Sequence, residues 1–225
     1  MSRVTQPKET KGSLKWIQDV INDCPILFNN TIHQAAGFGK WEAIEWLSPR
    51  EDDEYSEYRD KEFLDLLEIE LPYVELSEFW PSSGPQWDAL GRAGNDAYFL
   101  VEAKAHVTEM IVSSQAKSPE SKTLIEKSLN EIRAYLELNP EFDLTKDFYQ
   151  YVNRLAHLYL LRILNNVPVY LVFVYFLNDY THVPTSKPEW DGALNLMHSL
   201  LGTEGHNLSR YVIDVFIDVR NEEME

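Results

Sequence analysis

Residues 167–177 form the longest apolar stretch of the chain, and only Pro168 interrupts it. A strand that is apolar at consecutive positions is covered on both faces of its sheet, as the central strands of parallel sheets are. The stretch is well short of the roughly 20 residues that a helix needs to cross a bilayer. We therefore expect a buried strand in a protein that does not enter a membrane.

Periodic patterns on either side of this stretch predict its neighbours. Apolar residues recur at helical spacing in 14–20, 29–47, 118–136, 152–163 and 189–201, and strand-like patterns occur in 86–90, 97–105 and 211–219. Ser118 followed by Pro119 predicts a helix start, and Gly202 predicts a helix end. Residues 63–80 suit one or two half-exposed strands, although 64–68 also fit the end of a helix. This order of elements predicts an α/β fold, with a mixed sheet flanked by helices.

The length and composition of the chain bound its domain organisation. A chain of 225 residues with 44% apolar residues is long enough for one core and short for two. We expect a flexible N-terminal tail over residues 1–12, which lack apolar periodicity, and a single domain over residues 13–225. The lone Cys24 excludes an internal disulfide, and no signal-peptide pattern opens the chain, so a cytoplasmic location is expected.

The chain is strongly acidic, with 37 acidic and 20 basic side chains and a net charge of −17. This charge argues against a protein that binds duplex DNA over a broad surface, since such proteins are basic. Much of the excess lies in residues 51–60 and 221–225, and acidic runs of this kind are usually solvated loops or chain ends. Any contact with nucleic acid is therefore expected inside a cleft.

Chemistry is concentrated at the end of the strand expected over residues 97–105. Because side chains alternate across a strand, Glu102, Lys104 and His106 share one face with two apolar residues, Tyr98 and Leu100. Burying a carboxylate and an ammonium group is costly unless a partner or a metal satisfies them. The pair therefore marks a candidate functional site.

The preceding strand adds a second carboxylate to this site. Residues 91–96 are rich in turn-forming types, and a hairpin centred near Asn95 places Asp88 opposite Glu102. Two carboxylates, the backbone carbonyl of Ala103 and several waters would suit Mg²⁺ or Mn²⁺ better than Zn²⁺. A metal there would acidify a bound water and neutralise charge on a phosphate, while Lys104 orients that water or stabilises the oxyanion.

These residues resemble the signature of the PD-(D/E)xK, or restriction endonuclease-like, nuclease superfamily. Pro85 and Asp88 are followed, after thirteen intervening residues, by Glu102, Ala103 and Lys104, although Pro85 lies three positions before Asp88 instead of next to it. The resemblance implies an αβββαβ core, metal ligation by Asp88 and Glu102, and Lys104 as catalytic base or stabiliser. It also implies an acidic residue from the first core helix, here Glu42 or Glu45. The function implied is metal-dependent hydrolysis of DNA or RNA held in a cleft, with a homodimer as a further option.

The same residues allow other interpretations. Glu102 and Lys104 would also fit a salt bridge on an exposed sheet edge, and His106 would fit either a phosphate contact or a structural role. Glu109 and Gln115 are weaker candidates for the walls of the same cleft. The acidic surface would also suit a non-catalytic interaction protein on the same fold that binds a basic partner.

Overall fold

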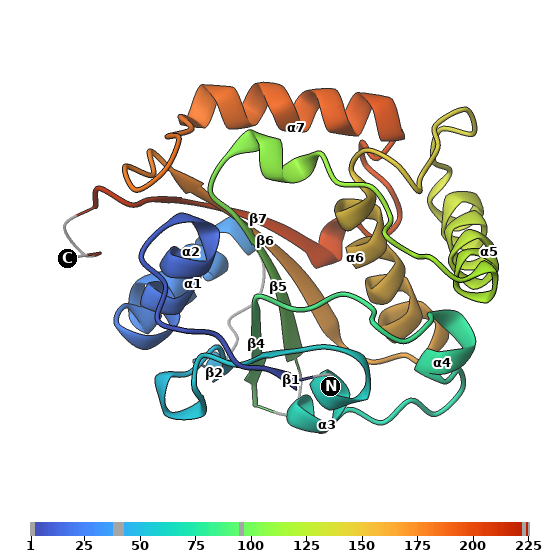
Figure 1. Ribbon diagram of the computed structural model, residues 1–225, viewed down its shortest axis with the longest axis horizontal. Coiled ribbons are helices and arrows are strands. Elements are labelled where there is room, and N and C mark those ends of the chain that lie inside the picture. Colours follow the sequence, from blue (N-terminus) through green and yellow to red (C-terminus); the bar gives the residue numbers. More distant parts are fainter. Residues whose placement is uncertain (1–2, 38–42, 95–96, 222–223, 225) are drawn as a thin grey trace.

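A five-stranded mixed sheet forms the centre of the protein in a computed structural model that describes residues 3–37, 43–94, 97–221 and 224 (Figure 1). Its strands follow the order β2-β4-β5-β6-β7. The neighbours β2, β4 and β5 pair antiparallel, whereas β5, β6 and β7 pair parallel. The bounds are β2 Glu45–Ser48, β4 Ala89–Ala93, β5 Ala97–Lys104, β6 Val169–Leu177 and β7 Val212–Asp218.

Helices cover both faces of this sheet, so the molecule has three layers. One face packs against α1 (Gly12–Asn22) and α2 (Pro25–Ala36). The opposite face packs against α3 (Asp60–Leu67), α4 (Leu76–Phe79), α5 (Pro119–Leu136), α6 (Tyr149–Tyr159) and α7 (Lys187–Leu201). Shorter elements are β1 (Arg3–Val4), β3 (Glu57–Tyr58), η1 (Glu51–Asp53), η2 (Val107–Met110), η3 (Leu160–Leu164) and η4 (Ser209–Tyr211).

Strand β6 confirms the prediction made from its apolar run. Val172, Val174 and Phe176 pack into the core under α1 and α2, while Leu171 and Phe173 pack into the opposite core. Both faces are covered because β6 lies between β5 and β7 with helices above and below. Among the described residues, no helix has the length and apolar character that a bilayer crossing requires.

The predicted ends of two helices are also confirmed. Ser118 caps α5, since its hydroxyl oxygen accepts a hydrogen bond of 3.0 Å from the backbone N–H of Ser121. Pro119 is the first residue of that helix, where its missing N–H costs nothing. Gly202 ends α7 at φ 72°, a left-handed conformation that glycine adopts without strain.

The single helix expected over residues 29–47 is wrong, because the chain ends α2 at Ala36 and forms β2 from Glu45. Gly37 caps α2 in the left-handed conformation, at φ 64°. Trp46 then pairs with Gly91 of β4 and stacks on Phe28 of α2, at 4.7 Å between ring centroids. Packing of this tryptophan between sheet and helix outweighs the helical spacing read from the sequence.

The strands expected over residues 63–80 are wrong as well, and the helical alternative for 64–68 is confirmed. Phe63, Leu64 and Leu67 are buried on one side of α3, which ends at Leu67. A second short helix, α4, follows within the same stretch. The acidic residues between the apolar ones are exposed, on these helices and on the turns beside them.

The N-terminal residues, expected to form a flexible tail over 1–12, have defined contacts from residue 3 onward. Arg3 and Val4 form β1, which pairs antiparallel with β3, so that Val4 lies opposite Glu57. The side-chain amide of Gln6 donates a hydrogen bond of 3.1 Å to Glu57. This segment therefore lies against β3 before α1 begins at Gly12.

Candidate functional site

The β4–β5 hairpin brings the two predicted carboxylates together. Ala89 pairs with Val101, the backbone N–H of Asp88 donates to the Val101 carbonyl at 3.1 Å, and Asp88 and Glu102 line the same cavity. The Asp88 carboxylate accepts a hydrogen bond of 2.6 Å from the backbone N–H of Ala103. Asn95, on which the predicted hairpin was centred, lies outside the described residues.

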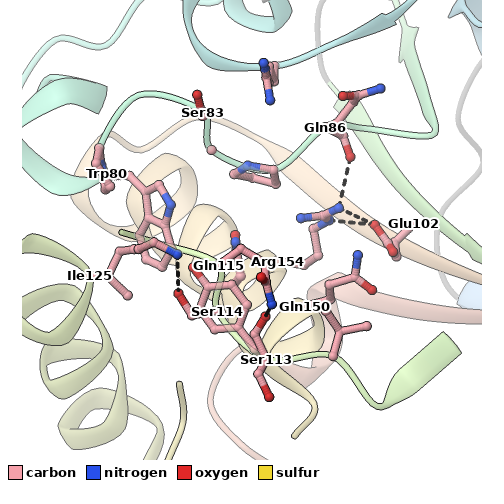
Figure 2. Close-up of a pocket in the computed structure, with 18 of the residues that line it drawn as sticks. Trp80, Ser83, Gln86, Glu102, Ser113, Ser114, Gln115, Ile125, Gln150 and Arg154 are labelled. Carbon is pink, nitrogen blue, oxygen red and sulfur yellow. Dashed lines mark hydrogen bonds and ion pairs between the residues drawn. The ribbon is translucent and has the colours of Figure 1, made fainter. Parts of the chain in front are cut away.

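Glu102 is held by two cations on the face of the sheet that packs against α6. One carboxylate oxygen pairs with the ammonium group of Lys104, and the other accepts a hydrogen bond of 2.8 Å from Nε of Arg154 in α6. Arg154 also donates to the backbone carbonyl of Gln86 at 2.9 Å, and Figure 2 shows its guanidinium group between Gln86 and Glu102. Glu102 is 2% exposed, so the salt bridge on an exposed sheet edge is excluded.

Glu57 supplies a third carboxylate that the sequence did not single out. Tyr58 bridges Trp87 in antiparallel fashion, so the next step of that register places Glu57 beside Asp88. Glu57 is 4% exposed, and its carboxylate accepts hydrogen bonds from the side-chain amides of Gln6 and Gln86. It belongs to the acidic run 51–60 expected to be a solvated loop, and for this residue that expectation is wrong.

Burial and mutual repulsion govern the charges of this cluster. Burial raises the pKa of Asp88 well above its usual value, and the charges of Glu102 and Glu57 raise it further. Burial also raises the pKa of Glu57. For Glu102, burial favours the neutral form, but Arg154 and Lys104 outweigh it and lower the pKa. For Lys104, burial is outweighed by Glu102 and Asp88, which raise its pKa. Three carboxylates thus face two cations, and a further cation would be stabilised there.

A cleft of about 640 Å³ opens above this cluster, and we call it the central cleft (Figure 2). Among the described residues that line it, Asp88 and Glu102 are the acidic ones, whereas four are cationic: Arg59, Lys104, Lys117 and Arg154. Its walls also carry the amide side chains of Gln86, Gln115, Gln150 and Asn153. In a chain with a net charge of −17, the charged side chains that line this cleft thus include more cations than carboxylates.

The structure does not confirm Glu45 as the additional acidic ligand. This residue lies on β2 opposite Arg92 and forms an ion pair with it at 2.9 Å. Arg92 is four residues along β4 from Asp88, which corresponds to about 13 Å of strand. The assignment fails because the helix expected to carry Glu45 is a strand, and Glu42 lies outside the described residues.

Of the three weaker candidates, one lines the central cleft and the other two have structural contacts. Gln115 lines the central cleft as predicted. Glu109 accepts from the backbone N–H of Ala105 and pairs with His106 at 3.2 Å. His106 also hydrogen bonds with Thr108 at 2.6 Å, which favours the structural role for this histidine.

The donor set fits a hard divalent cation in its chemistry. In the described part of the chain, no group of three or more His, Cys, Asp or Glu residues is arranged to hold a metal ion. Mg²⁺, however, commonly uses one or two carboxylates and keeps several waters. The backbone N–H of Ala103 points toward Asp88. The carbonyl of a strand residue points to the same side of the strand as its N–H, so the Ala103 carbonyl lies on the Asp88 side too. Asp88, Glu102 and this carbonyl are therefore a ligand set of the size that Mg²⁺ uses.

No family model, no curated protein and no solved structure matches this chain. The fold and the cleft define an α/β protein with a buried ionic cluster at the floor of a cationic cleft.

Proposed function

We propose that this protein is a Mg²⁺- or Mn²⁺-dependent nuclease that hydrolyses phosphodiester bonds of DNA or RNA. The observation that carries the proposal is the position of Asp88, Glu102 and Lys104, which share the floor of the central cleft. The excess of cationic over acidic side chains in the lining supports it, because a local excess of this kind in an acidic chain favours an anionic ligand.

The order of elements supports a restriction endonuclease-like core. Helix α2, the antiparallel strands β2, β4 and β5, helix α6 and the parallel strand β6 occur in the order αβββαβ, with β3, α3 and α4 inserted between β2 and β4 and with α5 inserted before α6. Asp88 lies immediately before the second of the three strands, β4, and Glu102 and Lys104 lie on the third, β5.

Each residue of the site has a distinct part in the proposed reaction. Asp88, Glu102 and the Ala103 carbonyl would hold the metal ion, which lowers the pKa of a bound water and offsets phosphate charge. Lys104 orients the attacking water or stabilises the oxyanion. The water oxygen bonds to phosphorus and the water gives up one proton, while the bond from phosphorus to one ester oxygen breaks and that oxygen takes up one proton in exchange. Arg154 positions Glu102 and adds positive charge near the phosphate.

Cleavage by the purified full chain tests this proposal. With millimolar Mn²⁺, we expect hydrolysis of at least one of single-stranded DNA, duplex DNA, single-stranded RNA and duplex RNA. Lys104→Ala should abolish cleavage while its circular dichroism spectrum stays native, and Lys146→Ala, which changes an exposed lysine, should cleave normally. Cleavage that persists in Lys104→Ala, or no cleavage of any of these substrates, would refute the proposal.

Metal binding separates the nuclease from the interaction protein considered as its alternative. Calorimetric titration with Mn²⁺ should show binding that disappears in Asp88→Asn and persists in Asp191→Asn, which alters an exposed carboxylate on α7. Indifference of the wild-type protein to Mn²⁺ would favour the non-catalytic alternative. A homodimer that pairs two clefts stays a prediction.

A further inference from the structure

One wall of the central cleft presents buried hydrogen-bond acceptors from two amide side chains. Gln150 and Asn153 lie about one turn apart on α6, and both line the cleft. Among the described residues, neither Oε1 of Gln150 nor Oδ1 of Asn153 has a hydrogen-bond partner, although both atoms are buried. Asn153 as a whole is 5% exposed. Buried acceptors are rarely left unpaired, so these two indicate a ligand that carries N–H donors.

Nucleobases supply such donors on the edges that they use for base pairing. The amino groups of adenine, cytosine and guanine can donate to the carbonyl oxygen of an asparagine or glutamine side chain. In a duplex these edges are occupied by the complementary strand. The two acceptors on α6 are therefore suited to a base that is unpaired.

The charges beside the cleft disfavour the binding of a second nucleic-acid strand. A neighbouring groove of about 700 Å³ shares Trp80, Pro81 and Ser82 with the central cleft, and we call it the acidic groove. Its lining carries four carboxylates and one cation: Asp60, Asp65, Glu70, Glu75 and Lys61. Charges within a Debye length of about 8 Å repel phosphates without much screening. A duplex has about twice the charge per unit length of one strand, so it is repelled more strongly.

We propose that the central cleft takes an unpaired strand of DNA or RNA, with a base edge donating to Asn153 and Gln150 and the adjacent phosphate at Lys104 and Arg154. This inference rests on the proposed nuclease function and adds the substrate class to it. The base contact and the acidic groove both select the single strand over the duplex.

Initial cleavage rates on matched substrates test the inference. One oligonucleotide sequence is offered with Mn²⁺ as single-stranded DNA, as single-stranded RNA, and as each of these annealed to its complement. We expect at least one single strand to be cut about tenfold or more faster than its duplex, and the DNA and RNA arms identify the sugar. Duplex cut as fast as single strand would overturn the inference and leave the nuclease proposal standing. No cleavage in any arm would overturn both.

A variant on α6 tests the base contact itself. The base-free phosphodiester bis(p-nitrophenyl) phosphate serves as the reference substrate, since it offers no N–H donors. Asn153→Ala should lower the ratio of kcat/KM on the single strand to kcat/KM on this reference by about tenfold. Asn195→Ala, which changes an exposed residue of α7, should leave the ratio unchanged. An unchanged ratio in Asn153→Ala would overturn the base contact, because a purely structural role would lower both activities together.

Discussion

His157 should make the protein sensitive to mild acid. The ring lies on α6 with its centroid 5.0 Å from that of Trp80 and 6.1 Å from that of Trp87, and it is 1% exposed. Nδ1 hydrogen bonds with the backbone carbonyl of Asn153 at 2.9 Å. Burial lowers the pKa of His157 from 6.5 to about 3, and the charge of Arg154 contributes in the same direction. The folded protein therefore keeps this ring neutral at pH values where the unfolded chain protonates it.

The free-energy cost follows from that difference in pKa. Below pH 6.5 the unfolded chain takes up a proton that the folded chain does not accept until about pH 3, so stability falls as pH falls through this window. Each pH unit inside the window costs about 1.4 kcal/mol. Between pH 6.5 and pH 5, His157 alone should therefore reduce the free energy of unfolding by about 2 kcal/mol.

Urea unfolding at pH 7 and at pH 5 measures this contribution. His157→Gln does not titrate, so its loss of stability on acidification should be about 2 kcal/mol smaller than that of the wild type. Other titrating groups are present in both proteins and cancel in the comparison. An equal loss in His157→Gln and the wild type would refute the reasoning.

Three further changes probe packing, capping and charge. Gly91→Ala would place a Cβ atom 2.8 Å from the Trp46 ring, so urea unfolding should show a loss of about 1–3 kcal/mol, and an unchanged midpoint would contradict the close approach. Ser118→Ala removes the α5 cap and should cost about 1 kcal/mol in the same assay, whereas no loss would mean that the cap contributes nothing. Asp88→Asn removes one of three crowded carboxylates, so the melting temperature in EDTA should rise. A lower melting temperature would indicate that repulsion in the cluster is already balanced.

The local sequence pattern was sufficient to predict those helices and strands whose structure depends mainly on their own residues. The apolar run of β6 and the capping residues of α5 and α7 predict what the structure shows. The closeness of Asp88 and Glu102 was also predictable, because a hairpin with a short turn brings neighbouring ends of its two strands together.

The rest of the site depends on contacts between distant parts of the chain. Arg154 approaches Glu102 from a helix that begins far along the sequence, and the only local sign was a cation beside the apolar face of that helix. Glu57 was hidden in an acidic run, where composition favours a solvated loop. The change from α2 to β2 was missed because the burial of Trp46 against Phe28 and β4 is a tertiary effect.

The pairing of β1 with β3 has a practical consequence for anyone who prepares this protein. Val4 lies opposite Glu57, and Gln6 donates to that same carboxylate, so the opening residues help to support the floor of the central cleft. An affinity tag fused directly before these residues, or a version trimmed to start at α1, would disturb that support. An inactive preparation of either kind would then report a damaged scaffold, so the activities of variants are best compared in a chain whose residues 3–6 are left intact.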